Sequence, residues 1–321
     1  MRDHGGNLDA ARALHGGPAD AWIDLSTGIN PRPYPLPPLP GTAFSALPTT
    51  EEAAALRRIA ARAWGARVLP VAAAGAQAAI QALPALAPPG KARVLGPTYN
   101  EHAAALRAAG WAVAEVDGPE ALAGADLAVV VNPNNPDGRR HPPAALRALS
   151  GRVGLLVVDE SFVDTEPGLS LLPGIGPEEG RIVVLRSFGK FYGLAGLRLG
   201  FAFSGEGLAG RLAERLGPWA VSGPAIAVGC AALPDRAWAE ATRRRLAADA
   251  ARLDACAARA GWQLVGGTPL FRLYDTPDAA AAQERLARAR IWSRRFPWSA
   301  GWLRLGLPDG PAWPRLEAAL S

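Results

Sequence analysis

The sequence predicts an α/β protein with two parts: a large domain, in which helices cover a mostly parallel sheet, and a smaller α+β domain built from the N- and C-terminal segments. Short apolar runs alternate with helical patterns from Glu51 to Phe203, as is typical of parallel sheets. After Gly205 the pattern changes to long helices followed by separated strands. At 321 residues and 49% hydrophobic composition, the chain is long enough for two domains.

The N-terminal part is predicted to contain a short helix and an irregular connector. The helix is expected around Asn7–Leu14. The stretch from about Trp22 to Thr50 is crowded with Pro, Gly, Ser and Thr, which favour turns and loops. We therefore expect an irregular connector there.

From Glu51 on, helices and strands are expected to alternate. Glu51–Trp64 and Ala76–Leu86 have helical patterns, and Val68–Ala73 between them is apolar and extended. Short apolar runs without polar alternation fit strands that are buried on both faces. The further strands predicted in this region are Ala92–Leu95, Ala112–Val116, Leu127–Val131, Gly154–Val158, Ile182–Leu185 and Leu199–Phe203.

The second domain is predicted from the change of pattern near Gly205. Long helical patterns cover Gly207–Leu216 and Asp235–Ala260, and three strand candidates follow. We predict that residues 1–45 join the small domain, 46–205 form the large domain and 206–321 form the C-terminal part of the small domain. The strand candidates are Gln263–Val265, Phe271–Tyr274 and Trp302–Leu305.

Composition argues against several classes of function. The formal net charge is +5, but the arginines are dispersed, so we predict no nucleic-acid partner. The run Arg243-Arg244-Arg245 lies in a helical pattern and is expected on a solvated face. Cys230 and Cys256 lie in apolar surroundings, where we expect them reduced and buried, without a disulfide framework or zinc cluster.

The four histidines show no metal-ligand spacing, so no metal site is predicted. The N-terminus lacks the apolar core of a signal peptide, and no stretch approaches the length of a membrane span. We therefore predict a cytoplasmic protein without a membrane partner.

Polar side chains follow several of the predicted strands. Ligands of parallel sheets bind beyond the carboxyl ends of the strands, so these side chains are predicted to share one site. Taken singly, Asn-Asn-Pro-Asp-Gly is also good turn chemistry, and Asp159 could cap the next segment. The residues at these strand ends are Gly75 at a helix start, the run Asn132–Gly138, Asp159, Ser187 and Lys190.

Lys190 is one of two lysines in a chain that uses Lys or Arg 34 times. Arginine supplies positive charge almost everywhere else in the chain. A primary amine can form an imine with an aldehyde, whereas a guanidinium cannot and stays protonated. Lys190 is therefore a candidate for covalent chemistry, although a lysine considered alone is more often a surface residue.

These motifs resemble fold type I pyridoxal-phosphate enzymes, the aspartate aminotransferase superfamily, over nearly the whole chain. The motifs are Asn-Pro-Asn-Asn-Pro-x-Gly from Asn132, Asp-Glu-x-aromatic from Asp159, Ser-x-Gly-Lys ending at Lys190 and Gly-Leu-Arg-x-Gly around Arg198. The resemblance implies pyridoxal 5'-phosphate as cofactor and a homodimer as the assembly.

The resemblance also implies the roles of site residues. Lys190 would form the imine with the cofactor, and Asp159 would face the pyridine nitrogen, where a carboxylate favours the protonated ring. Asn135 would donate to the phenolate oxygen, and Tyr99 would stack on the ring. The residues implied for the cofactor phosphate are Gly75, Ala76 and Gln77 through backbone N–H groups, with Ser187 and Arg198.

A narrower resemblance is to the threonine-phosphate decarboxylase branch of cobalamin biosynthesis, which is related to histidinol-phosphate aminotransferases. It implies a lyase that converts L-threonine O-3-phosphate, a small phosphorylated amino acid, into 1-amino-2-propanol O-phosphate. His4, Ser26 and Asn30 would bind the substrate phosphate, and Arg304 the carboxylate. The segments that carry this resemblance are His4–Asn7, Asp24–Pro31, Gly217–Pro224, Arg294–Phe296 and Trp302–Pro308.

An aminotransferase of the histidinol-phosphate type is the alternative. The reaction depends on which Cα bond stands perpendicular to the cofactor ring, and a sequence does not reveal that angle. A regulatory domain of a transcription factor is disfavoured because we expect no room in the chain for an added DNA-binding segment. A scaffold that has lost catalysis is disfavoured because Lys190, Asp159, Asn135 and Arg198 are all present.

The chain departs from the family pattern at two places. Phe162 stands where many members have a tyrosine that donates to the phenolate oxygen, so Asn135 would hold that oxygen without it. Leu47-Pro48 stands where members tend to have Tyr-Pro. The contact of that tyrosine with the partner subunit's cofactor phosphate would therefore be missing.

Overall fold

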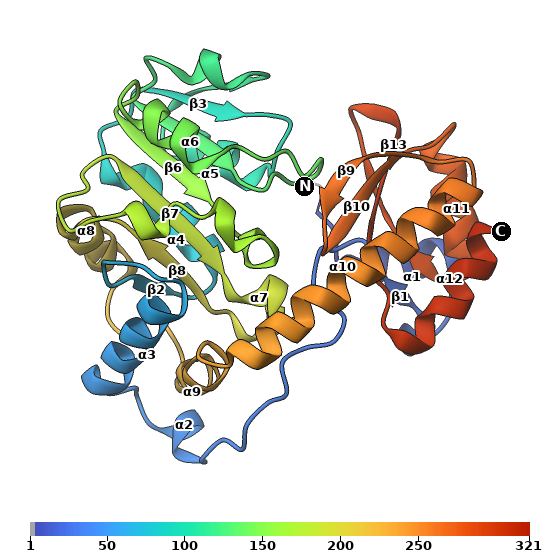
Figure 1. The fold of residues 1–321 in the computed structure, drawn as a ribbon, viewed down its shortest axis with the longest axis horizontal. Coiled ribbons are helices and arrows are strands. Elements are labelled where there is room, and N and C mark those ends of the chain that lie inside the picture. The colour runs from blue at the N-terminus through green and yellow to red at the C-terminus, as the bar shows by residue number, and fades with distance from the viewer. Residues whose placement is uncertain (1–3) are drawn as a thin grey trace. The chain divides into compact units, whose positions relative to one another are not determined.

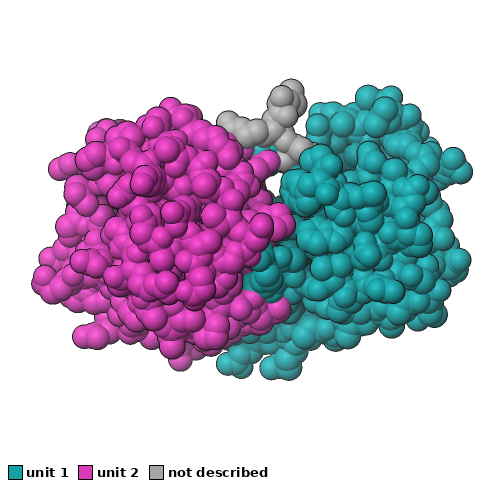
Figure 2. Space-filling view, turned by 90° about the horizontal axis from the view of Figure 1, so that it is seen from above, with its two compact units in different colours: residues 1–33, 136–139, 240–321 teal, residues 34–135, 140–239 magenta. Residues whose placement is uncertain are grey.

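The computed structural model describes residues 4–321, which form two compact units (Figures 1 and 2). Unit 1 contains residues 4–33, Pro136–Arg139 and Glu240–Ser321, and unit 2 contains Tyr34–Asn135 and Arg140–Ala239. The sequence analysis placed domain boundaries after residues 45 and 205. The segment beyond 205 begins in unit 2 because helix α8 (Glu206–Leu216) packs on helix α4 (Ala76–Ala82) and strand β2 (Val71–Ala73).

Unit 2 is built on a mostly parallel sheet, as predicted. Within the described residues its seven strands lie in the order β2-β8-β7-β6-β5-β3-β4. Neighbours from β7 through β4 are parallel, and β8 runs antiparallel to β7 and β2. The strands are β2 (Val71–Ala73), β3 (Lys91–Leu95), β4 (Ala112–Val116), β5 (Leu127–Val131), β6 (Leu155–Asp159), β7 (Ile182–Ser187) and β8 (Gly200–Phe203).

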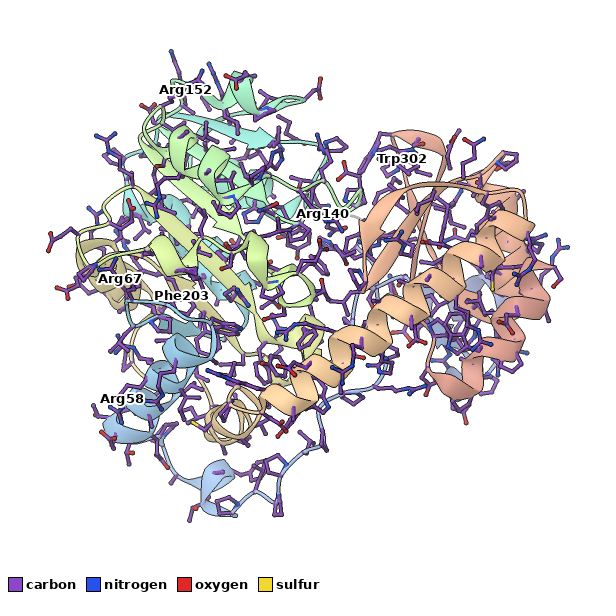
Figure 3. The ribbon with its side chains drawn as sticks, viewed as in Figure 1. Arg58, Arg67, Arg140, Arg152, Phe203 and Trp302 are labelled. Atoms are coloured by element: carbon purple, nitrogen blue, oxygen red, sulfur yellow. The ribbon has the colours of Figure 1, made fainter. Side chains whose placement is uncertain are left out.

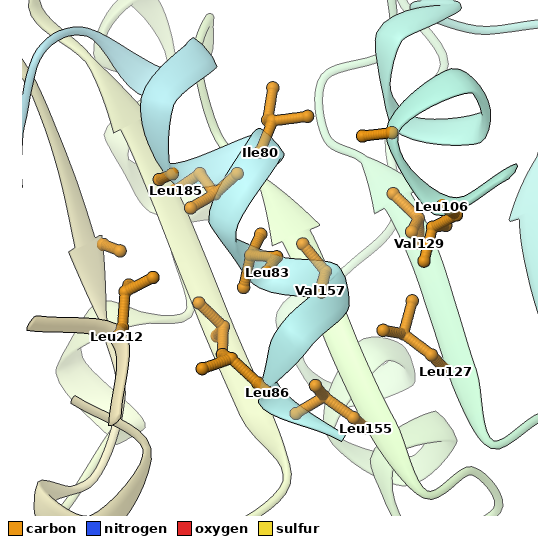
Figure 4. Packing of buried hydrophobic residues seen from close by; sticks show 14 of the residues in the cluster. Ile80, Leu83, Leu86, Leu106, Leu127, Val129, Leu155, Val157, Leu185 and Leu212 are labelled. Carbon is orange, nitrogen blue, oxygen red and sulfur yellow. The ribbon is translucent and has the colours of Figure 1, made fainter. Parts of the chain in front are cut away.

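The central strands are covered on both faces. Every residue of β5 and β6 is buried, which explains why their sequences are continuous apolar runs rather than alternating ones. Helix α4 (Ala76–Ala82) continues into the 3-10 turn Leu83–Leu86, because Pro84 lacks the N–H that an α-helix needs. Figure 4 shows Ile80, Leu83 and Leu86 of this segment packed over the sheet.

The other helices of unit 2 also follow from local signals. Helix α3 (Thr50–Ala63) begins at a capping box, in which Thr49 and Glu52 bond each other's backbone N–H groups. Helix α9 is apolar on all sides, as expected for a buried helix. The remaining helices are α2 (Thr42–Ser45), α5 (Glu101–Ala108), α6 (Pro143–Ser150), α7 (Phe188–Phe191) and α9 (Gly223–Ala232).

Unit 1 joins the two ends of the chain. Strand β1 (Ile23–Asp24) pairs in parallel with β11 (Ile291–Trp292), and an antiparallel sheet has the order β12-β13-β10-β9. Helix α10 (Arg236–Arg259) starts in unit 2 and continues in unit 1. The other elements are α1 (Leu8–His15), β9 (Gln263–Thr268), β10 (Phe271–Asp275), α11 (Ala279–Arg288), β12 (Arg294–Phe296), β13 (Ser299–Gly306) and α12 (Trp313–Leu320).

The structure corrects some of the finer expectations. The stretch predicted to be an irregular connector contains β1 and α2. Arg245 does not lie on a fully solvated helix face, because its guanidinium donates to Asn30 at 2.7 Å and pairs with Asp249 at 3.2 Å. Cys256 is buried, but Cys230 is partly exposed. In residues 4–321, no helix combines the length and apolarity required to cross a membrane.

Candidate active site

The cofactor residues predicted from the sequence lie around one cavity in unit 2. This cavity has a volume of about 150 Å³. Strand register explains the grouping, since Val131, Asp159 and Leu185 stand side by side at the ends of β5, β6 and β7. Every residue predicted to bind the cofactor lines the cavity: Gly75, Ala76, Gln77, Tyr99, Asn135, Asp159, Ser187, Lys190 and Arg198.

Lys190 lies on α7, a one-turn helix directly after β7. Its Nζ lies 5.7 Å from the centre of the Phe162 ring. A single turn is unstable alone, and stacked rings support it here. Tyr192 stacks on Phe188 at 4.3 Å and on Trp238 at 5.5 Å, measured between ring centres. The direction of the Lys190 amine therefore depends on aromatic packing at both ends of α7.

Asp159 is buried, and both of its carboxylate oxygens accept hydrogen bonds. His102 Nε2 lies 2.8 Å from Oδ2, while the backbone N and Oγ of Ser161 donate to Oδ1 at 2.9 and 2.5 Å. Burial raises the pKa of Asp159, but hydrogen bonding and electrostatic attraction from His102, with the Ser161 bonds, outweigh it and lower the pKa. Asp159 is thus held ionised.

The sequence analysis did not identify His102 as a site residue. It lies in the first turn of α5, three residues after Tyr99, and the two rings meet edge to face with centres 6.1 Å apart. A spacing of three residues at the start of a helix places the Tyr99 and His102 side chains next to each other. A histidine three residues after the predicted stacking residue was the available signal.

Tyr99 is held by a polar network. Its hydroxyl donates to Gln77 Oε1 at 3.2 Å, and Gln77 Nε2 donates to Glu101 Oε2 at 3.0 Å. The Gln77 side chain therefore orients the aromatic ring, a role that the sequence analysis did not foresee. The backbone N–H of Gln77 lies in the first turn of α4, where helix N–H groups have no partner within the helix.

Arg198 and Gly75 lie against each other. A Cβ added to Gly75, whose φ is +77°, would lie 2.7 Å from Arg198 Nη2, so the glycine permits this approach. Arg198 itself has a left-handed φ of 56° and donates to Ala195 O at 3.0 Å. Arg198 is exposed.

The donor set around the cavity fits pyridoxal 5'-phosphate. Lys190 offers an amine for the aldehyde, and Asp159 offers an ionised carboxylate for the ring nitrogen. The phosphate has the Arg198 guanidinium, the Ser187 hydroxyl and the first turn of α4, which has no side-chain cap.

The predicted substrate residues all belong to unit 1. His4 and Ser26 line a second cavity of about 510 Å³, which Arg294 also lines, whereas Asn30 and Arg304 do not. The side-chain oxygen of Asn30 accepts hydrogen bonds from the backbone N of Arg32 at 3.1 Å and from Arg245 at 2.7 Å. The Asn30 oxygen therefore braces its own turn and α10.

Arg304 is buried and lies beside a second cation. Its Nη2 donates to the Ser26 carbonyl at 2.6 Å, and Arg294 faces it on the neighbouring strand. Burial and Arg294 lower the pKa of Arg304, and Asp24 opposes them. Two arginines so close together favour an anion between or beside them. Arg294, quoted in the sequence as part of a motif but given no role, is therefore a candidate binding residue.

Comparison with known proteins agrees with this arrangement. The family profile described as "Aminotransferase class I and II" matches residues 41–312. The chain is 46% identical to threonine-phosphate decarboxylases of a Sinorhizobium species and of Pseudomonas aeruginosa, over 99% and 100% of its length and 97% of each relative. It is 33% identical to a histidinol-phosphate aminotransferase of Mycobacterium bovis, over 73% of this chain and 67% of the relative.

Solved structures share the fold. Histidinol-phosphate aminotransferase from Sinorhizobium meliloti, solved with pyridoxal-5'-phosphate, aligns with a TM-score of 0.80 at 21% identity over 97% of this chain and 93% of that chain. L-threonine-O-3-phosphate decarboxylase from Porphyromonas gingivalis aligns with a TM-score of 0.74 at 20% identity, over 92% and 97%. At this level of identity the likeness concerns the fold.

Proposed function

Because the chain belongs to the class I and II aminotransferase family, we propose that it is a pyridoxal-phosphate-dependent decarboxylase of L-threonine O-3-phosphate. The observation that carries this proposal is the 46% identity, over essentially the whole chain, to two threonine-phosphate decarboxylases. The product is 1-amino-2-propanol O-phosphate. We assign the reaction to cobalamin biosynthesis and to the cytoplasm.

The cofactor, when bound, supplies an electron-accepting ring that stabilises negative charge at the substrate Cα. Lys190 would hold the cofactor through its side-chain amine. Asp159, kept ionised by His102 and Ser161, would favour a protonated ring nitrogen. Carbon dioxide leaves without its bonding electrons, which remain at Cα, and one proton is then added there. The Lys190 amine, which lines the cavity, is the group that we assign to deliver that proton.

The substrate carries two anionic groups, and unit 1 offers two arginines. Arg304 is assigned to the carboxylate, and Arg294 with His4 and Ser26 to the phosphate. Arginine suits both anions because its guanidinium can donate two parallel hydrogen bonds. Anchoring the phosphate would leave Arg304 to set the orientation of the carboxylate.

A homodimer is the assembly that best fits the surface of unit 2. Phe44, Leu47 and Trp219 are 70%, 66% and 60% exposed. Trp219, with Leu69, also lines a groove of about 810 Å³. Exposed apolar surface of this kind marks association sites. We assign it to a second copy of this chain, since the resemblance implies a homodimer.

Transamination of histidinol phosphate is the second candidate, favoured by the 33% identity to the Mycobacterium bovis aminotransferase. It uses the same cofactor residues. The alternatives differ in whether Cα loses carbon dioxide or a proton.

One experiment separates the two reactions. The purified holoenzyme is incubated with threonine phosphate and, separately, with histidinol phosphate plus 2-oxoglutarate. Carbon dioxide release without any requirement for the keto acid supports the decarboxylase, and glutamate formation in the second incubation overturns it. A Lys190→Ala variant tests cofactor attachment independently, because it should lose the visible absorbance of the bound cofactor.

A further inference from the structure

The loop after β5 carries Asn135 between two anchors. The first anchor is inside unit 2. Asn132 closes the base of the loop, donating to the His141 carbonyl at 3.0 Å and accepting from the His141 N–H at 2.9 Å. The side-chain oxygen of Asn134 accepts a hydrogen bond from the Thr98 hydroxyl at 2.6 Å, and Asn134 Nδ2 donates to the Pro97 carbonyl at 3.0 Å. The chain is therefore held up to the residue before Asn135.

The second anchor is strand β9. Unit 1 contains both this strand and the loop residues Pro136–Arg139. A Cβ added to Gly266 would lie 2.1 Å from the Asp137 carbonyl oxygen, and one added to Gly138 would lie 2.2 Å from the Gly267 carbonyl oxygen. The backbone of the loop tip thus packs directly on the backbone of β9. Any side chain at these positions would separate the two segments.

The backbone conformations of these glycines distinguish two reasons for glycine, which are a positive φ and the close approach of another backbone segment. Gly138 and Gly267 have φ values of +70° and +142°, so both need glycine for conformational reasons as well. Gly266 has no such φ, so the approach of Asp137 is the main steric constraint there. The β9–β10 register shifts beside this point, between Leu273 and Tyr274, as at a β-bulge that redirects a strand.

The loop tip is also stiffened from within. The Arg139 N–H donates to Asp137 Oδ1 at 2.9 Å, and the Arg139 guanidinium pairs with Asp137 Oδ2 at 2.7 Å. Pro136 has a nearly fixed φ. A displacement of Asp137 is therefore transmitted along a short, stiff stretch of chain to Asn135.

From these contacts we infer that Gly266 and Gly267 are positioning residues, through which β9 fixes the Asn135 amide at the cofactor cavity. The inference rests on the proposed function, in which Asn135 donates to the phenolate oxygen of the cofactor. It adds that this donation depends on a backbone contact made far away in sequence. Gly266→Ala is the selective test, because its methyl group meets the Asp137 carbonyl.

The readout is the pKa of the Lys190–cofactor linkage, followed by visible absorbance against pH. Without the Asn135 hydrogen bond, more negative charge stays on the phenolate oxygen and holds the linkage proton more tightly. We expect Gly266→Ala to raise this pKa by about one unit, the size of a hydrogen bond to a charged group. Val265→Ala, in the same strand and 41% exposed, is the matched control and should leave it unchanged.

A double-variant cycle excludes a general loss of stability as the cause. Asn135→Ala should raise the same pKa, and adding Gly266→Ala to it should cause no further rise. An additive rise in the double variant, or an unchanged pKa in Gly266→Ala, overturns the inference. If Gly266→Ala does not fold, Asp137→Ala replaces it, with a smaller rise expected and no rise overturning the inference.

A second measurement does not depend on the cofactor. In the cofactor-free protein, amide hydrogen exchange of residues 132–141 should be faster in Gly266→Ala than in the wild type or in Val265→Ala. Unchanged exchange overturns the inference even if the proposed function holds. Failure of the proposed function is recognised by a different result. In that case the Lys190→Ala variant keeps the visible absorbance band that is assigned to the Lys190–cofactor linkage.

Discussion

Hydrogen bonds keep the buried carboxylate of Asp159 ionised. Burial by itself would favour the neutral acid, yet three hydrogen bonds, from His102 and Ser161, reach the carboxylate. The pKa of Asp159 is therefore lower in the folded protein than in the unfolded chain. His102 is the group whose removal should reverse this balance.

We expect His102→Ala to weaken cofactor binding by about 10- to 100-fold, the effect of losing one hydrogen bond to a charged group. Without His102, burial dominates and Asp159 pairs less well with a protonated ring nitrogen. Equilibrium titration with the cofactor measures the change. His15→Ala, in α1 of unit 1, is the control, and equal affinity of the two variants would contradict this role.

The same residue predicts a pH dependence of stability. Because the folded pKa of Asp159 is lowered, its stabilising contribution is present above the unfolded pKa of about 4. That contribution is lost as the pH falls through the folded value. The difference in unfolding free energy between wild type and His102→Ala should therefore be largest near neutral pH and shrink in acid. Urea titrations at several pH values test this, and a constant difference would contradict it.

The substrate-binding role that we propose for Arg304 should oppose its effect on the stability of the unliganded protein. It is buried beside Arg294, and both effects lower its pKa. We expect Arg304→Met to weaken substrate binding by about 30- to 1,000-fold, the range for truncating one member of a buried charge pair. The unliganded protein should be no less stable, because a buried charge is replaced by an apolar side chain. Calorimetry measures both quantities, and a large loss of stability would contradict this expectation.

At the scale of elements, a buried ionic network joins β6 and β7 beside the cavity. Arg186 of β7 contacts Glu160 at 3.3 Å and pairs with Asp164 after β6. Its guanidinium also lies 4.5 Å from the ring centre of Trp64, the residue after α3, and Trp64 Nε1 donates to Asp164 at 2.9 Å. The network ties together the strand ends that carry Asp159 and Ser187.

Removing the cation should therefore loosen these elements together. We expect Arg186→Met to lower the unfolding free energy by about 3–5 kcal/mol, because it leaves Glu160 and Asp164 buried without the Arg186 charge. Arg58 of α3, labelled at the surface in Figure 3, pairs with the exposed Glu51. Arg58→Met should change the unfolding free energy by less than about 1 kcal/mol. Similar losses in the two variants, measured in urea, would contradict the proposed difference.

At the scale of the whole molecule, the exposed apolar face of unit 2 predicts self-association. Trp219 is 60% exposed and lines the groove there. Trp219→Arg places a charge on this surface, and burying it in an interface is unfavourable. We expect the wild type to sediment as a dimer and Trp219→Arg to shift toward monomer. Trp298→Arg, 52% exposed in unit 1, is the control, and a monomeric wild type would contradict the assignment.

The alternation of strands and helices in unit 2 could be predicted because the central parallel strands contain uninterrupted apolar runs, such as Leu127–Val131. Elements without such a local signal escaped prediction. Helix α9 is apolar on all sides, so it lacks the periodicity of a surface helix. Strands β1 and β11 span two residues each, and pairing between distant segments defines them.

The sequence by itself determined the main sheet and the residues gathered at its carboxyl edge, because the apolar runs of the strands and the groups that follow them are local properties. Tertiary structure decided which side chains support those residues. His102 bonds Asp159, from which it is separated by 57 positions in the sequence. Gly266 packs against the Asp137 carbonyl although the two residues are far apart in the sequence. Such partners are selected by packing in three dimensions, and a single sequence contains no spacing that reveals them.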